Sequence, residues 1–154
     1  MDKEVLLTLN GVKNYFPVKD GALSKAKNYV KAVNDVNLKI YKGETLGLVG
    51  ESGCGKTTLG KTILQLYKAT DGEIIYNFED GERDLTKLKK DEMDLARKKI
   101  QIVFQDPHSS LNPSFTIYQS LSDPLKKFGV KSKEERRKII GDLLEAVNMR
   151  REYM

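Results

Sequence analysis

The sequence predicts an α/β fold in which an antiparallel β annex comes first, a strand–loop–helix unit follows, and a helical tail ends the chain. Three observations predict this class. Residues 35–44, "DVNLKIYKGE", alternate apolar and polar side chains, as a strand with one solvated face does. Residues 45–50, "TLGLVG", form an unbroken apolar run that leads into a glycine-rich loop and then into helix-favouring residues. Beyond residue 115 the pattern is helical.

The annex consists of short strands. Residues 4–18 predict two strand pieces broken at Asn10 and Gly11, and the polar residues 19–29 predict a loop. The strand in 35–44 is expected to turn at Lys42 and Gly43.

The middle of the chain alternates strands and helices. We expect a strand buried on both faces at 45–50, a helix over 56–67 with Leu59 and Ile63 on one face, and a strand at 73–78 that enters a hairpin turn at Asp80 and Gly81. A charged helix over 85–98 and a second buried strand at 100–105, "IQIVFQ", should follow.

The last forty or so residues predict helices after the turn-rich segment 106–114. Ser132 and Glu135 have the spacing of a capping box. An apolar stripe follows at helical spacing, comprising Ile139, Ile140, Leu143, Leu144 and Val147.

Composition limits the classes of protein. With 154 residues, 39% of them hydrophobic, the chain suits one domain with a core, and its net charge of +5 comes from basic residues mixed with acids rather than from a nucleic-acid-binding stripe. The single cysteine, Cys54, excludes an internal disulfide and fits a reducing compartment. No signal peptide or run of 18 apolar residues occurs, so we expect a cytoplasmic protein that reaches the membrane only through partners.

Residues 50–57, "GESGCGKT", carry the chemistry, because they match the phosphate-binding pattern G-x-x-x-x-G-K-[ST] between an expected strand and an expected helix. Glycines allow the backbone N–H groups to surround a polyphosphate, and the start of the helix adds its positive dipole end. Lys56 would reach the β and γ phosphates, and Thr57 would offer its hydroxyl to a magnesium ion. The predicted phosphate-binding residues are Gly50, Ser52, Gly53, Cys54, Gly55, Lys56, Thr57 and Thr58.

Two other interpretations of this loop are weaker. A dinucleotide-binding G-x-G-x-x-G motif would need a glycine where Thr58 stands. A reactive thiol at Cys54 is conceivable from its place in the loop, but a small side chain at a permissive position explains it more simply.

The flanks of the loop resemble the nucleotide-binding subunit of ABC transporters. The segments that carry the resemblance are "YFPVK", "KAVNDVNLKIYKGETLGLVGESGCGKTTLG", "FQDPHSSLNPSFTI" and "DPL", and they are most similar to oligopeptide and dipeptide importers over about residues 6–153. The resemblance implies a P-loop NTPase core with an N-terminal antiparallel β annex over residues 1–110. It also implies the beginning of a helical subdomain over residues 111–154.

The resemblance assigns further roles. Tyr15 falls where such subunits carry the aromatic that stacks on adenine, and its neighbour Phe16 is a rival for that role. Gln105 corresponds to the glutamine that contacts magnesium and the attacking water, and with Lys56 it is a predicted catalytic residue. His108 is expected to be a surface-loop histidine rather than the family's switch histidine, and Asp106 is expected to lie in the same loop.

Three family motifs do not occur among these residues: the Ser-Gly-Gly-Gln signature, the apolar strand ending in Asp-Glu, and the switch histidine. We therefore expect an incomplete nucleotide-binding domain that binds nucleotide but lacks the groups for hydrolysis, with incomplete burial around 45–50 and 100–105. The parent protein would be an ATPase that binds ATP and Mg²⁺ and works with permease subunits, a second ATP-binding subunit and, indirectly, an extracytoplasmic peptide-binding protein. The resemblance implies oligopeptides or dipeptides as its cargo, and a metal chelate or a sugar is the alternative.

Two alternatives come from other classes. A small P-loop kinase acting on a metabolite would use "KKFGVKSKEERRK" as a lid, but it leaves the annex and the "FQDP" segment unexplained. A non-catalytic nucleic-acid-binding module is suggested only by the positive net charge.

Overall fold

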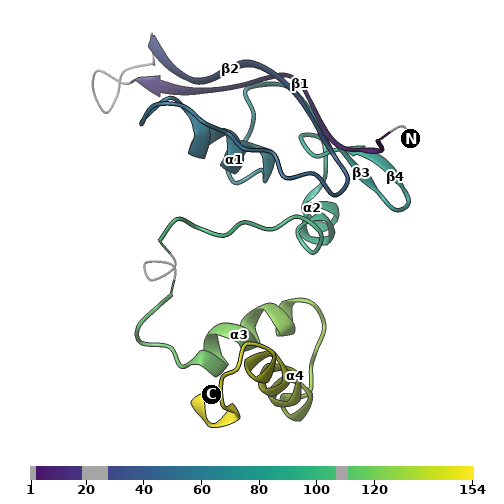
Figure 1. The fold of residues 1–154 in the computed structure, drawn as a ribbon, viewed down its shortest axis with the longest axis vertical. Helices are drawn as coiled ribbons and strands as arrows, with labels where there is room; N and C mark the ends of the chain where they lie inside the picture. Colours follow the sequence, from purple (N-terminus) through teal and green to yellow (C-terminus); the bar gives the residue numbers. More distant parts are fainter. Residues whose placement is uncertain (1–2, 19–27, 107–110) are drawn as a thin grey trace. The chain divides into compact units, whose positions relative to one another are not determined.

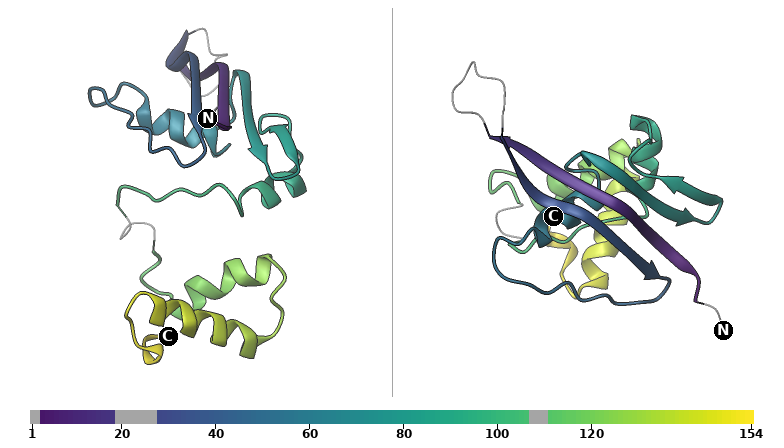
Figure 2. Two further views of the ribbon diagram at one scale, coloured as in Figure 1. Left: turned by 45° about the vertical axis from the view of Figure 1, so that its right-hand side comes forward. Right: turned by 90° about the horizontal axis from the view of Figure 1, so that it is seen from above.

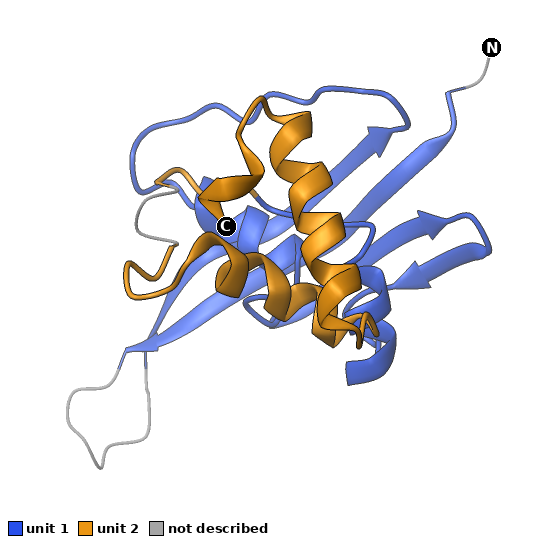
Figure 3. Ribbon diagram, turned by 90° about the horizontal axis from the view of Figure 1, so that it is seen from below, with its two compact units in different colours: residues 1–102 blue, residues 103–154 orange. Residues whose placement is uncertain are grey.

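The computed structural model describes residues 3–18, 28–106 and 111–154. The chain divides into two compact units, residues 1–102 and residues 103–154, which are coloured separately in Figure 3. The division lies ahead of the boundary expected from the sequence, and residues 1–110 and 111–154 as functional domains remain a prediction.

Unit 1 contains one four-stranded antiparallel sheet. Its strands are β1 (Val5–Val18), β2 (Asn28–Tyr41), β3 (Asp71–Phe78) and β4 (Gly81–Asp84), in the spatial order β2-β1-β3-β4. β1 and β2 form a long two-stranded ribbon, and the shorter β3–β4 hairpin lies along the other edge of β1 (Figures 1 and 2). The predicted antiparallel annex is therefore present.

β1 is one strand, so the predicted break at Asn10 and Gly11 is wrong. The pairing register with β2 shifts between Leu9 and Val12, and Gly11 has a φ of 57° there. The Gly11 N–H donates a hydrogen bond of 2.8 Å to Asn37 Oδ1, which keeps the irregular position attached to β2. Asn10 and Gly11 mark a β-bulge inside the strand. A β-bulge favours the same residue types as a turn.

The turns of the annex follow the sequence closely. The turn at Lys42 and Gly43 is confirmed, with a φ of 72° at Gly43. β3 pairs with β4 through Phe78 and Gly81, so the connecting residues are Glu79 and Asp80, one position earlier than predicted.

Helix α1 (Lys56–Ile63) lies against the β1–β2 ribbon, as Figure 1 shows. It is shorter than the predicted 56–67, because Gln65 adopts a left-handed φ of 53° that ends the helical path. The helix presents Leu59 to a core shared by the sheet and α2, whose buried members are Leu7, Leu9, Val12, Val33, Leu59, Ile74, Leu85 and Ala96.

The two expected buried strands do not form. Residues 44–50 and 100–104 have no strand structure, and Val49 and Val103 are 92% and 93% exposed. A parallel strand needs neighbouring strands to take its backbone hydrogen bonds and cover both its faces, and the described residues supply no such neighbours for these two segments. The expected incomplete burial of both segments is confirmed.

Helix α2 (Lys90–Ala96) begins later than the predicted 85–98. The residues before it are held to the hairpin: the Leu85 N–H donates to the carbonyl oxygen of Ile74 at 2.7 Å, and Asp84 Oδ1 accepts from the Thr86 N–H at 3.0 Å. These hydrogen bonds hold the turn of residues 85–87 that follows β4, so the helix begins after it.

Unit 2 is helical, as predicted. It contains α3 (Ile117–Lys127), α4 (Lys133–Ala146) and a 3-10 turn, η2 (Arg151–Tyr153). Ser132 Oγ accepts from the Glu135 N–H at 3.2 Å and caps α4. Only part of the predicted stripe is buried, since Ile140 and Leu144 lie in the core while Leu143 and Val147 are exposed. Across the described residues, no helix combines the length and apolar character that crossing a membrane requires.

Candidate functional site

The glycine-rich loop, residues 50–55, turns at two glycines with left-handed backbone angles. Gly53 has a φ of 83° and Gly55 a φ of 99°, a region that side chains with a β-carbon rarely occupy. A β-carbon on Gly50 would lie 2.8 Å from Cys54 Sγ, so this glycine permits a close approach across the loop. The sequence places glycines where this path requires them.

Gly55 also fixes the loop against β2. It is the residue preceding α1, and a β-carbon there would lie only 2.1 Å from the carbonyl oxygen of Ala32. The carbonyl oxygen of Gly55 accepts the helical hydrogen bond from the Leu59 N–H at 2.8 Å. The start of the helix is therefore packed directly on the strand.

Lys56 opens α1, and its ammonium group bonds across the loop. Lys56 Nζ donates to the carbonyl oxygens of Gly50 and Glu51, each at 2.7 Å, and lies 3.5 Å from Cys54 Sγ. A compact cation is thereby held at the loop, where an incoming anion would meet it together with the first N–H groups of the helix.

The hydroxyl residues of the loop differ in their surroundings. Ser52 and Thr57 are exposed, whereas Thr58 is half-buried, and its carbonyl oxygen accepts from Thr62 Oγ1 at 2.7 Å. Cys54 is an exposed free thiol. Ser52 and Thr57 are thus accessible to a ligand at the loop.

The two rival aromatics have different partners. The Tyr15 hydroxyl donates to Asn34 Oδ1, and the ammonium group of Lys31 lies 5.5 Å from the centre of its ring. The ring of Phe16 instead packs edge-to-face on Tyr67, with 5.5 Å between centroids. The ring of Phe16 therefore packs on a residue that follows α1. Tyr15 is the better candidate for stacking on a base.

The remaining predicted residues lie in the segment after α2. Gln105 and Asp106 are exposed and belong to unit 2, whereas the loop and Tyr15 belong to unit 1. Their roles stay predictions. His108 lies outside the described residues.

The comparisons with known proteins decide the family. A family model described as ABC transporter matches residues 33–153. The chain belongs to the ABC transporter family. This membership favours the ABC interpretation over the small kinase.

Relatives in the ABC family carry names from peptide transport. The chain is 41% identical over 149 residues to the oligopeptide transport ATP-binding protein AppF of Bacillus subtilis, covering 96% of this chain and 44% of the relative. It is 40% identical over 151 residues to the dipeptide transport ATP-binding protein DppF of Haemophilus influenzae, again covering 96% and 44%. The chain spans less than half the length of these relatives.

The fold is also that of the ABC family. The structure superposes on the dimeric ATP-binding cassette MJ0796, in a post-hydrolysis state with ADP and Pi, with a TM-score of 0.68. The identity is 30%, and the match covers 91% of this chain and 56% of the other. The predicted α/β class, as part of an ABC nucleotide-binding domain, is confirmed.

The donor set around the loop fits magnesium bound together with a polyphosphate. The described residues contain no group of three or more His, Cys, Asp or Glu side chains that could hold a metal ion on its own. Mg²⁺ keeps several waters and commonly takes one or two protein ligands besides phosphate oxygens. The exposed Thr57 hydroxyl, next to Lys56, suits that arrangement.

Sequence reasoning missed the residues that support the loop from β1 and β2. Asn14 is buried, and its Nδ2 donates to Thr62 Oγ1 at 2.9 Å and to the carbonyl oxygen of Lys68 at 3.1 Å, which joins β1 to α1. Ala32 gives the loop its contact through Gly55. Asn14 is one of several polar residues of β1, so the sequence does not mark it, and nothing in the sequence marks Ala32.

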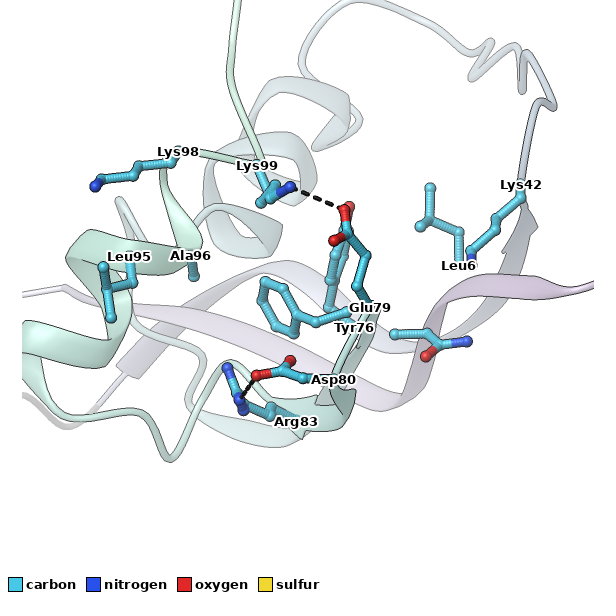
Figure 4. A pocket seen from close by; sticks show the side chains of 12 residues that line it. Leu6, Lys42, Tyr76, Glu79, Asp80, Arg83, Leu95, Ala96, Lys98 and Lys99 are labelled. Carbon is cyan, nitrogen blue, oxygen red and sulfur yellow. Dashed lines mark hydrogen bonds and ion pairs between the residues drawn. The ribbon is translucent and has the colours of Figure 1, made fainter.

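Unit 1 also contains a cavity of about 560 Å³, drawn in Figure 4, that no motif indicates. Tyr76 and Phe78 line it with their rings 4.5 Å apart. Lys99 pairs with Glu79 at 3.0 Å beside it, and Arg83 pairs with Asp80. Its lining residues come from β1, the turn after β2, the β3–β4 hairpin, α2 and the residues that follow α2, and none of them belongs to the glycine-rich loop.

Proposed function

We propose that this chain binds Mg-ATP at the glycine-rich loop and the first residues of α1, as part of the ATP-binding subunit of an ABC importer. The observation that carries the proposal is the position of Lys56 Nζ, held 2.7 Å from two carbonyl oxygens of the loop at the start of α1. A cation and the first N–H groups of a helix together form a site for a polyphosphate.

The phosphate contacts follow from this geometry. Gly50, Gly53 and Gly55 leave the loop backbone open, Ser52 and Cys54 complete the loop, and Thr58 lies in the first turn of α1. When phosphate oxygens arrive, Lys56 exchanges its bonds to neutral carbonyl oxygens for bonds to the charged β and γ oxygens. The phosphate oxygens carry negative charge that the carbonyl oxygens lack, and their attraction to the ammonium group favours the exchange.

Three further residues are proposed to contact the adenine base and the magnesium ion. Tyr15 would stack on the base, because a flat aromatic ring binds any purine face without needing many hydrogen bonds. Thr57 would give its hydroxyl to Mg²⁺. Gln105 would contact the same ion and the attacking water, as the family resemblance implies.

The transported cargo is proposed to be oligopeptides or dipeptides. Support comes from the names of the relatives, which are oligopeptide and dipeptide transport ATP-binding proteins. The whole subunit would be an ATPase at the inner face of the cell membrane. Its partners would be permease subunits, a second ATP-binding subunit, which the dimeric neighbour supports, and indirectly an extracytoplasmic peptide-binding protein.

Nucleotide binding, rather than hydrolysis, is the activity proposed for these 154 residues. Phosphoryl transfer depends on placing water and neutralising charge around the γ phosphate. The residues that do this in the family, in the signature segment, the Asp-Glu strand and the switch histidine, do not occur in the sequence.

Calorimetric titration with Mg-ATP tests the proposal. Wild-type protein should bind, and Lys56→Ala and Tyr15→Ala should each weaken binding by about tenfold or more. Lys68→Ala and Tyr29→Ala are the matched controls, since both side chains are exposed and lie outside the proposed site. Equal effects of site and control variants, or no binding by a folded wild-type chain, would contradict the proposal.

A further inference from the structure

The side chain of Tyr15 is held by two residues of β2, Lys31 and Asn34, for which the sequence predicts no role. Its hydroxyl donates to Asn34 Oδ1, and Lys31 Nζ lies 5.5 Å from its ring centre. We infer that Asn34 and Lys31 are positioning residues that fix the Tyr15 ring as a platform for the adenine base. This role rests on the nucleotide function proposed above and adds two residues to it.

The bond to Asn34 fixes where the ring of Tyr15 lies. A tyrosine ring turns about two side-chain torsions, and a hydrogen bond at the hydroxyl restrains the first, because the hydroxyl oxygen lies far from that bond but on the axis of the second. Asn34 is exposed, so water competes for this bond and its contribution is modest. The expected result is a preorganised ring, which lowers the ordering cost of binding a base.

Lys31 acts on a face of the ring. Tyr15 and Lys31 are cross-strand partners in the β1–β2 pairing, and side chains that pair directly in this way contact one another. An ammonium group over an aromatic ring is attracted to its π face. With Lys31 covering that face, a base would stack on the opposite one.

The backbone at Tyr15 is fixed from the other side of β1. The Tyr15 N–H donates to Thr70 Oγ1 at 2.9 Å, and the Thr70 N–H donates to the carbonyl oxygen of Lys13 at 2.8 Å. The main chain is thus held by the residue that leads into β3, while the side chain is held by β2. Both restraints act on the one residue proposed to contact adenine.

The platform also lies near the phosphate loop. Lys31 is followed directly by Ala32, whose carbonyl oxygen is the atom that a β-carbon on Gly55 would meet at 2.1 Å. One short stretch of β2 therefore supports both the Tyr15 ring and the start of α1. A nucleotide could contact Tyr15 with its base and the loop with its phosphates.

Comparison of Mg-ATP with Mg-tripolyphosphate tests this role, because tripolyphosphate lacks the base. Asn34→Leu and Lys31→Met should each weaken Mg-ATP binding by about two- to fivefold and leave Mg-tripolyphosphate binding unchanged. Asn34→Asp keeps an acceptor for the Tyr15 hydroxyl and Lys31→Arg keeps the cation, so both should restore wild-type affinity for Mg-ATP. Lys39→Met, on an exposed residue of the same strand, is the control.

The outcomes separate this role from the proposed function. Unchanged Mg-ATP affinity in Asn34→Leu and Lys31→Met, with a loss in Tyr15→Ala, would overturn the positioning role and leave the nucleotide function standing. Equal losses for both ligands would also overturn it, since they would indicate general damage to unit 1. Failure of the wild-type protein to bind either ligand would contradict the nucleotide function itself.

Discussion

Lys56 Nζ lies 2.7 Å from the carbonyl oxygen of Gly50, so the lysine that follows the loop bonds back to the residue that begins it. The same ammonium group also bonds to Glu51, and the loop is therefore closed by a charge. A polyphosphate that enters the loop must accept hydrogen bonds from this ammonium group in place of the two carbonyl oxygens. The geometry makes Lys56 the residue on which phosphate binding depends most.

Lys56→Arg should not preserve nucleotide binding, although it preserves the charge. A guanidinium group is planar and larger, and it cannot place a single compact donor between two carbonyl oxygens as the ammonium group does. We expect Mg-ATP affinity to fall by about tenfold or more in a fluorescence titration with a labelled nucleotide. Wild-type affinity in the arginine variant would mean that charge alone suffices.

Gly55→Ala should destabilise the chain more than Gly43→Ala. Both glycines have left-handed angles, with φ of 99° and 72°, so each substitution costs about 1–2 kcal/mol of backbone strain. A β-carbon at Gly43 meets open space, whereas one at Gly55 would clash with the carbonyl oxygen of Ala32. We expect an additional loss of about 1–3 kcal/mol for Gly55→Ala in urea unfolding without nucleotide. Equal losses would argue against the close packing of the loop on β2.

The buried pair Asn14 and Thr62 should show a measurable coupling energy. Asn14 is 2% exposed and Thr62 is fully buried, and the bond of 2.9 Å between them joins β1 to α1. Asn14→Ala should cost about 1–3 kcal/mol, because it leaves the Thr62 hydroxyl and the carbonyl oxygen of Lys68 without this donor.

A double-mutant cycle with Thr62→Val checks this, since contacting residues couple by about 0.5–3 kcal/mol. Additive effects of the two substitutions would show that the bond contributes nothing specific. Thr8→Val is a suitable control to combine with Thr62→Val, because Thr8 pairs with Lys39 of β2.

Protonation of Asp84 should lower the stability of unit 1 as the pH falls below about 4. Partial burial tends to raise the pKa of its carboxyl group, but hydrogen bonds from Lys87, from Thr86 and from the N–H of Ile74 outweigh this and lower it below its usual value. A lowered pKa in the folded state stabilises the protein above the pKa of the unfolded chain, and this stabilisation is lost as the pH falls through the folded value.

The pH dependence is measured by comparing wild type with Asp84→Asn. The difference in unfolding free energy between them should be full above about pH 5 and should shrink steadily toward pH 3. A difference that stayed constant over this range would show that ionisation of Asp84 does not cause the pH dependence of stability.

The loop and its helix were predictable because their signals are local. Glycines at positions 50, 53 and 55, followed by Lys56, specify a turn and a helix start without reference to the rest of the chain. The β3–β4 hairpin was predictable for the same reason, with an error of one residue at Asp80.

The strands at 45–50 and 100–105 were not predictable, because a strand depends on its neighbours. Their apolar residues indicate burial, yet Val49 and Val103 are exposed where no adjacent strand pairs with them. The strand break predicted at Gly11 was wrong for a different reason. A glycine in a strand pattern marks either the end of the strand or a β-bulge, and only the pairing with β2 distinguishes the two. The support of Tyr15 by Asn34 depends likewise on cross-strand register, which one strand's sequence does not reveal.

Amide chemical shifts of the chain during titration with Mg-ATP test the central claim most directly. We expect the largest changes at Gly53, Gly55, Lys56 and Thr57, with a second group at Tyr15, and we expect Lys56→Ala to abolish them. Changes confined to other parts of unit 1, such as the cavity lined by Tyr76 and Phe78, or no changes in a folded chain, would contradict it.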